Sequence, residues 1–162
     1  MNKKVLIILL SLSGSLFAVQ DENIDKNNHK SHDGSNPFVM IARLTVKPGM
    51  VEEYLKIADD VDKITDQKEP GMLFHNFDAD PDNPLGFNWT EVYSNSEALV
   101  IHLTADYALD YVGKHNELAD SFSIEIYGNL SDEAIKAVLN LGLPFKHFKT
   151  TRVGYVRESK FK

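Results

Sequence analysis

The sequence predicts an α+β domain, in which helices cover one face of a sheet and leave the other face open. Segments rich in β-branched and aromatic residues, which are typical of strands, alternate with segments whose apolar residues recur every three or four positions, as in helices. Turn residues separate these segments at 47–49, 69–71 and 80–84. The resulting order is strand-helix-strand-strand-helix-strand, the ferredoxin-like split βαβ arrangement.

The pattern places each element in turn. The strands of this unit are expected at 38–46, 72–78, 87–93 and 122–127. The helices are expected at 50–64 and, after an N-cap at 94–97, at 98–103 and 106–119. An extra helix at 134–141 and a fifth strand at 148–157 follow. The ordered domain therefore spans 37–162, with a core at 38–127 and a C-terminal extension at 128–162.

The N-terminus has the parts of a cleavable signal peptide at residues 1–18. Lys3 and Lys4 precede an apolar run, and small or permissive residues lead to Ala18. The apolar run is much shorter than the ~20 residues that cross a bilayer. Residues 19–36 hold few large apolar side chains, so we expect a flexible linker there. The signal peptide therefore predicts a periplasmic or secreted protein.

Composition excludes several classes of function. The chain has 24 acidic and 17 basic residues, and signal cleavage would remove two lysines and no acid. Such an acidic protein is repelled by nucleic acid and by anionic lipid, so neither is an expected partner. The absence of cysteine excludes disulfides, thiolate metal sites and cysteine nucleophiles. No phosphate-binding loop, nucleophile elbow or zinc-type histidine pair is present, so we expect no metal or other cofactor.

A family resemblance rests on several short runs in a fixed order. Thr45-Val46-Lys47-Pro48-Gly49 leads into a helix that begins at Met50, and Glu69-Pro70-Gly71 precedes the second strand. Residues 89–99 (WTEVYSNSEAL) are followed by His102-Leu103-Thr104-Ala105-Asp106. From Phe38 to Tyr127 the chain resembles the antibiotic biosynthesis monooxygenase family. The resemblance implies a dimeric α/β-barrel fold, and hence a homodimer, more firmly than any activity.

Relatives in this family oxidise quinols or polycyclic phenols with dioxygen and without metal or flavin, while others degrade haem. The haem-degrading branch uses an asparagine in the first strand, where this chain has Met40, Ala42 and Arg43. His115 is the only imidazole near the position of the axial ligand, about one turn late. The resemblance therefore favours a cofactor-free reaction over a haem-dependent one.

The third predicted strand carries the candidate binding surface. Alternation places Phe87, Trp89, Glu91 and Tyr93 on one face, where three aromatic rings surround one carboxylate. This surface could clamp a flat aromatic substrate while Glu91 orients a hydroxyl group or a histidine. The alternative is a core strand in which Glu91 pairs with an arginine such as Arg43.

Two histidines are the candidate bases. His75 lies on the same face of the second strand as Leu73 and Phe77, and His102 matches a position where the family commonly carries histidine. A base that removes a phenolic proton would make the substrate electron-rich enough to react with dioxygen. The alternative is that both imidazoles are structural. Asn76, on the other face of the second strand, is a further candidate for substrate binding.

Two classes of function stay open at this stage. One is a cofactor-independent monooxygenase that acts on a quinol or another electron-rich aromatic compound. The other is an exported, non-catalytic barrel that binds a small molecule or acts in stress.

Overall fold

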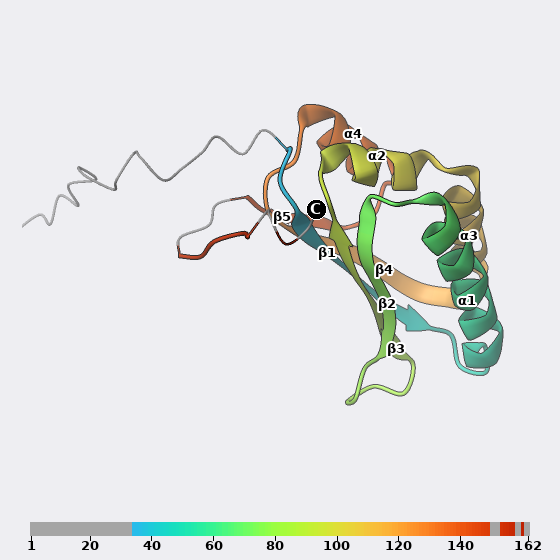
Figure 1. Cartoon of the computed structure of the whole chain (residues 1–162). Coiled ribbons are helices and arrows are strands. Elements are labelled where there is room, and N and C mark those ends of the chain that lie inside the picture. The colour runs from blue at the N-terminus through green and yellow to red at the C-terminus, as the bar shows by residue number, and fades with distance from the viewer. Residues whose placement is uncertain (1–33, 150–152, 158–159, 161–162) are drawn as a thin grey trace, which may run out of the picture. The chain divides into compact units, whose positions relative to one another are not determined.

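The computed structural model describes residues 34–149, 153–157 and 160 of the 162-residue chain (Figure 1). The predicted signal peptide and residues 19–33 of the predicted linker lie outside this range. Within the described ranges, no helix combines the length and hydropathy needed to cross a membrane.

The described chain forms one five-stranded sheet and four helices. In chain order these are β1 (Phe38–Val46), α1 (Val51–Lys68), β2 (Met72–Ala79), β3 (Gly86–Tyr93), α2 (Ser96–Thr104), α3 (Asp106–Leu118), β4 (Ala119–Tyr127), α4 (Asp132–Asn140) and β5 (Phe145–Phe148). The strand order is β2-β3-β1-β4-β5, with β3 antiparallel to both β1 and β2. This is the split βαβ arrangement, so the predicted α+β, ferredoxin-like class is confirmed. The sheet of the single chain is open.

The fifth strand is not where the sequence pattern placed it. It covers Phe145–Phe148 and runs parallel to β4, whereas residues 153–157 form no strand. Phe145 packs against the core, while Val153 and Tyr155 are exposed. The position beside β4 is thus taken by the earlier segment, whose Phe145 reaches the core.

Order also begins before the predicted end of the linker. Gly34 is buried, and its carbonyl accepts a hydrogen bond of 2.7 Å from the amide of Ser96 at the start of α2. Gly34 has a φ of 84°, and a Cβ there would stand 2.5 Å from Ser96 Oγ. Only glycine meets both conditions without strain. Residues 34–36 therefore belong with the folded domain.

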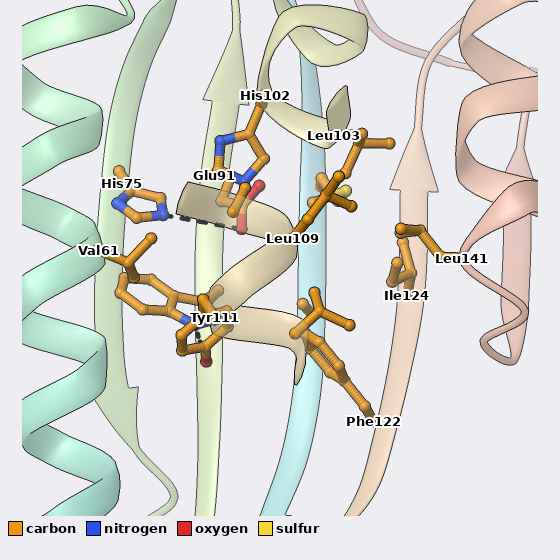
Figure 2. Close-up of a pocket in the computed structure, with 15 residues that line it drawn as sticks. Val61, His75, Glu91, His102, Leu103, Leu109, Tyr111, Phe122, Ile124 and Leu141 are labelled. Atoms are coloured by element: carbon orange, nitrogen blue, oxygen red, sulfur yellow. Dashed lines mark hydrogen bonds and ion pairs between the residues drawn. The ribbon is translucent and has the colours of Figure 1, made fainter. Parts of the chain in front are cut away.

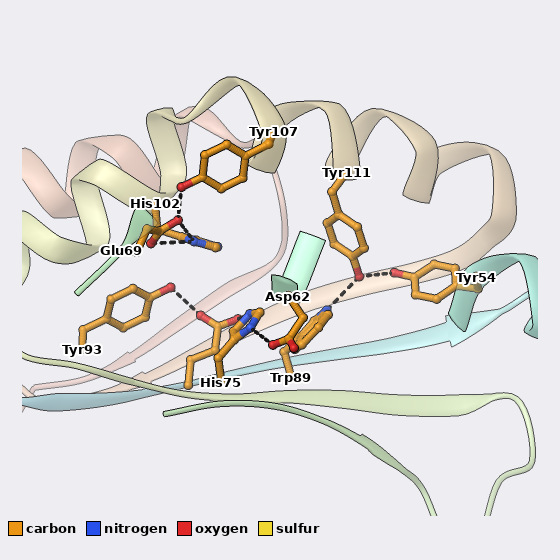
Figure 3. A network of polar contacts seen from close by, with 10 residues as sticks. Tyr54, Asp62, Glu69, His75, Trp89, Tyr93, His102, Tyr107 and Tyr111 are labelled. Carbon is orange, nitrogen blue, oxygen red and sulfur yellow. Dashed lines mark hydrogen bonds and ion pairs between the residues drawn. The ribbon is translucent and has the colours of Figure 1, made fainter. Parts of the chain in front are cut away.

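The helices lie on one face of the sheet, and that face holds the core (Figures 1 and 3). Alternate residues of β1, from Phe38 to Val46, are at most 3 % exposed. Phe87, Trp89, Glu91 and Tyr93 of β3 all point to the same buried side, as predicted. Tyr54 and Val61 of α1 pack onto them. A carboxylate is therefore held inside an aromatic core.

None of the helices in the described residues lies on the opposite face of the sheet, and strand register arranges the residues of this face in rows. One row crosses all five strands and consists of the apolar or aromatic residues Phe74, Val92, Val39, Tyr127 and Phe148. Beyond the neighbouring row lies Arg43, which donates to Asn88 and pairs with Glu125 at 3.5 Å. The open face thus has an apolar end next to a charged centre.

Candidate active site

A small cavity lies between the sheet and helices α2 and α3 (Figure 2). Its volume is about 40 Å³. Most of its wall is aliphatic, and the polar groups gather at one end. The lining residues used below are His75, Trp89, Glu91, His102, Tyr111 and the leucines 103, 109 and 141.

His75 stands at the polar end of the cavity and is held from two sides. Its Nδ1 lies 2.8 Å from an oxygen of Asp62 on α1, and its ring stacks on Trp89 with ring centres 4.2 Å apart. Its Nε2 points toward Glu91, at 4.0 Å from the nearer carboxylate oxygen (Figure 2). One nitrogen is thus anchored and the other faces the cavity, which is the arrangement a general base needs.

Glu91 is 3 % exposed and accepts a hydrogen bond of 2.5 Å from the hydroxyl of Tyr93. The alternative pairing with Arg43 is wrong. In β1, Arg43 faces the open side of the sheet opposite Asn88, so its guanidinium cannot reach the buried side. Burial, followed by the negative charge of Glu91, raises the pKa of Tyr93 well above its usual value. Tyr93 therefore stays protonated and serves Glu91 as a donor.

His102 occupies the other side of Glu91 and is anchored by a second carboxylate. Its Nδ1 lies 3.0 Å from an oxygen of Glu69, and the hydroxyl of Tyr107 donates to the same carboxylate at 2.5 Å (Figure 3). Burial disfavours the charged forms of both Glu69 and His102. The hydrogen bonds from His102 and Tyr107 outweigh burial and lower the pKa of Glu69.

The contact with Glu69 has the opposite effect on the imidazole of His102, whose pKa it raises. Burial alone would lower the pKa of His102, but the hydrogen bond to Glu69 and the charge of Glu91 outweigh burial and raise it. Both shifts favour the charged forms, an imidazolium and a carboxylate that are hydrogen-bonded to each other as buried charges must be. His102 consequently brings positive charge to the cavity beside Glu91.

A second chain of hydrogen bonds leaves the cavity through Trp89. The indole nitrogen of Trp89 donates to the hydroxyl of Tyr111 at 2.8 Å. That hydroxyl shares a hydrogen bond of 2.6 Å with the hydroxyl of Tyr54, which in turn lies 2.7 Å from Nδ1 of His115. Tyr54 and His115 are buried and lie behind the cavity wall.

The structure brings together only part of the set of candidates predicted from the sequence. His75, Trp89, Glu91 and His102 line one cavity, and Tyr93 acts on it through Glu91. Phe87 lies outside it and stacks on Phe77.

Asn76 does not reach the cavity. It is exposed and lies along an open groove of about 390 Å³ beside α1, which shares His75 and Trp89 with the cavity. Its place in β2 explains this, because adjacent residues of a strand point to opposite faces and His75 takes the inner one.

Four polar residues of the site were missed by the sequence analysis. Asp62 and Tyr111 look like ordinary helical positions, and Tyr107 precedes the apolar stretch of α3. Glu69 stands directly before Pro70-Gly71 and was interpreted only as part of a turn. A carboxylate so close to a Pro-Gly turn and a following strand is the one signal that could have pointed to it.

Within the described part of the chain, no group of three or more His, Cys, Asp or Glu residues is placed to hold a metal ion. Each cavity histidine already has its Nδ1 bonded to a carboxylate.

Comparison with known proteins places most of the domain in a family. Residues 37–114 match the family model described as antibiotic biosynthesis monooxygenase. This segment is an antibiotic biosynthesis monooxygenase domain. It contains His75, Glu91 and His102, whereas α4 and β5 lie beyond the matched segment. The monooxygenase-family segment thus supplies the polar end of the cavity, and the extension adds Leu141 to its wall.

Solved structures share the fold of this monooxygenase-family domain. A candidate antibiotic biosynthesis monooxygenase from Caulobacter crescentus is 22 % identical with a TM-score of 0.55, over 57 % of this chain and 89 % of that one. Another from Bacteroides thetaiotaomicron is 20 % identical with a TM-score of 0.52, over 56 % and 87 %. An uncharacterized protein of Synechocystis sp. is 27 % identical over 128 residues, which are 77 % of this chain and 84 % of that protein.

The burial of His115 predicts how the stability of the fold depends on pH. Burial, and then the positive charge of Lys47, lower the pKa of His115 to about 4, while Tyr54 contacts its ring and Tyr111 lies behind Tyr54. Between pH 6.5, the ordinary pKa of histidine, and pH 4, the unfolded state binds a proton at His115 and the folded state does not. The free energy of unfolding therefore falls as the pH falls. At ~1.4 kcal/mol per pH unit, His115 should contribute a loss of about 2–3 kcal/mol between pH 6.5 and 4.

Urea unfolding at several pH values measures this loss. His115→Gln keeps a polar side chain without the ionisation, so its free energy of unfolding should fall less steeply than that of the wild type over this range. Equal slopes for the two proteins would contradict the assignment.

Proposed function

We propose that this domain is a cofactor-independent monooxygenase that oxidises a quinol or another electron-rich aromatic compound with dioxygen. One observation carries the proposal. Two imidazoles, each anchored at Nδ1 by its own carboxylate, flank the buried Glu91 at the polar end of an otherwise apolar cavity. The family assignment supports an oxidation of the monooxygenase type.

The first step is removal of a phenolic proton from the substrate. Nε2 of His75 faces the cavity, and Asp62 fixes the ring orientation and stabilises the imidazolium that forms. The resulting phenolate is electron-rich and passes an electron to dioxygen. The substrate itself thus supplies the reducing power.

His102 has a different part in this scheme. Its raised pKa makes it an imidazolium rather than a base, because Glu69 and Glu91 both favour its charge. A fixed cation in a site with little water stabilises the phenolate and the reduced oxygen species that follow. We therefore assign His75 as the base and His102 as the electrostatic stabiliser.

The size of the cavity sets a condition on substrate entry. About 40 Å³ holds roughly three water molecules, whereas a benzene ring has been accommodated in a cavity of ~150 Å³. An aromatic substrate therefore needs the wall to move. Leu103, Leu109 and Leu141 come from α2, α3 and the end of α4, so their side chains can separate without disturbing the sheet.

Oxygen uptake by metal-free protein over a panel of hydroquinones and naphthols tests the proposal. The wild type should consume dioxygen with at least one of them, with the binding of each compound measured in parallel. His75→Ala should lose ~10²–10⁴-fold in turnover, as expected for a general base, and His102→Ala should also lose turnover.

His147→Ala is the matched control, because its Nε2 bonds the carbonyl of Gly128 and the residue does not line the cavity. Melting temperatures of all variants separate loss of chemistry from loss of folding. Wild-type turnover in both the His75 and His102 variants would refute the site. Binding without oxygen uptake would instead support the non-catalytic binding protein.

We also propose that the domain is a homodimer that buries the open face of the sheet. No described element of the chain covers the apolar row that includes Phe74, Val92 and Val39, and a second copy would remove it from water. Val39→Lys should shift light scattering from dimer to monomer, since it places a charge in the row. Gln67→Lys, exposed on α1 and so away from this face, is the control. A wild-type monomer at micromolar concentration would contradict the proposal.

A further inference from the structure

The buried aromatic chain behind the cavity has no part in the proposed reaction. It comprises Trp89, Tyr111, Tyr54 and His115, supplied by β3, α3 and α1. Trp89 and Tyr111 line the cavity, and the other two do not. The chain therefore leads from the place of the proposed oxygen chemistry into the interior of the domain.

Donor and acceptor rules fix the direction of one of these hydrogen bonds and allow a common direction for all three. An indole nitrogen only donates, so Tyr111 accepts from Trp89. Tyr111 can then donate to Tyr54, and Tyr54 can donate to Nδ1 of His115 when the ring proton is on Nε2. His115 can accept because burial, with the charge of Lys47, lowers its pKa to about 4 and leaves it neutral. In this arrangement every proton of the hydrogen-bonded series points toward His115.

The ring geometry allows electrons to move along the same path. The rings of Trp89 and Tyr111 have centres 6.2 Å apart, and those of Tyr111 and Tyr54 have centres 6.0 Å apart. Electron tunnelling falls off exponentially with distance, and neighbouring rings of this kind are in edge contact. Burial and the neighbouring Tyr111 raise the pKa of Tyr54, so the phenol cannot simply lose its proton to water. Loss of its electron must be accompanied by proton transfer to His115.

We propose that Trp89, Tyr111, Tyr54 and His115 form an internal redox relay that removes oxidising equivalents from the cavity. An oxygen-centred radical formed there takes one electron from Trp89 and becomes an anion. Trp89 regains an electron from Tyr54 through Tyr111. Tyr54 loses one electron and passes its hydroxyl proton to Nδ1 of His115, which leaves a neutral phenoxyl radical beside an imidazolium. The identity of the oxidant rests on the proposed function, but the relay does not.

Laser photoionisation tests the relay directly, because Trp89 is the sole tryptophan of the chain. The flash creates the oxidised indole at a known position, and transient absorption distinguishes the indole radical from the phenoxyl radical. In the wild type the indole signal should decay as the phenoxyl signal rises. Tyr111→Phe should abolish this coupled rise, and His115→Gln should reduce the phenoxyl yield. Tyr127→Phe, on the open face of the sheet, is the matched control and should behave as the wild type.

A second measurement needs no variant and so does not depend on folding. The phenoxyl rise should be slower in D₂O than in H₂O, because a proton moves with the electron. Equal indole decay in the wild type and Tyr111→Phe, or no isotope effect on the rise, would overturn the relay. Since no substrate is used, a working relay without oxygen uptake would refute the proposed function alone, and the reverse result would refute the relay alone.

Discussion

The arrangement of the site depends on one buried contact, that between Glu69 and His102. Glu69 lies between α1 and β2, and His102 lies on α2, so the contact fixes a helix against the start of a strand. Two buried charges are stable there only because each has hydrogen-bonded partners, Tyr107 among them. Without Glu69, burial would favour the neutral form of His102. The contact thereby holds a cation at the cavity wall that the apolar core would otherwise exclude.

The alternation of β3 explains why much of the site could be predicted. Once residues 87–93 were assigned to a strand, Trp89, Glu91 and Tyr93 had to share a face, and the buried face was the aromatic one. The fold class followed in the same way from element order and turn residues. His75 and His102 could be proposed because imidazoles stand out in apolar segments. Their partners could not, because an aspartate such as Asp62 on an acidic helix has no distinctive sequence pattern.

The segments that the sequence analysis placed wrongly are those whose position is set by tertiary contacts. Val153 and Tyr155 have strand-like composition, yet the edge of the sheet is taken by Phe145–Phe148. Gly34 is ordered by its fit against Ser96, which lies far away in sequence. The direction of the pKa shift at His102 likewise depends on Glu69, so the sequence presented two equivalent imidazoles where the structure gives them different environments.

The protonation state of His102 tests this account most directly. Nitrogen-15 NMR of the ring, with His102→Gln to assign the signals, reads the state of both nitrogens at about pH 7, where an ordinary histidine is mostly neutral. We expect both nitrogens of His102 to carry protons, and Glu69→Gln to return the ring toward neutrality. A neutral His102 ring in the wild-type protein would contradict the central claim that a buried ion pair charges the cavity wall.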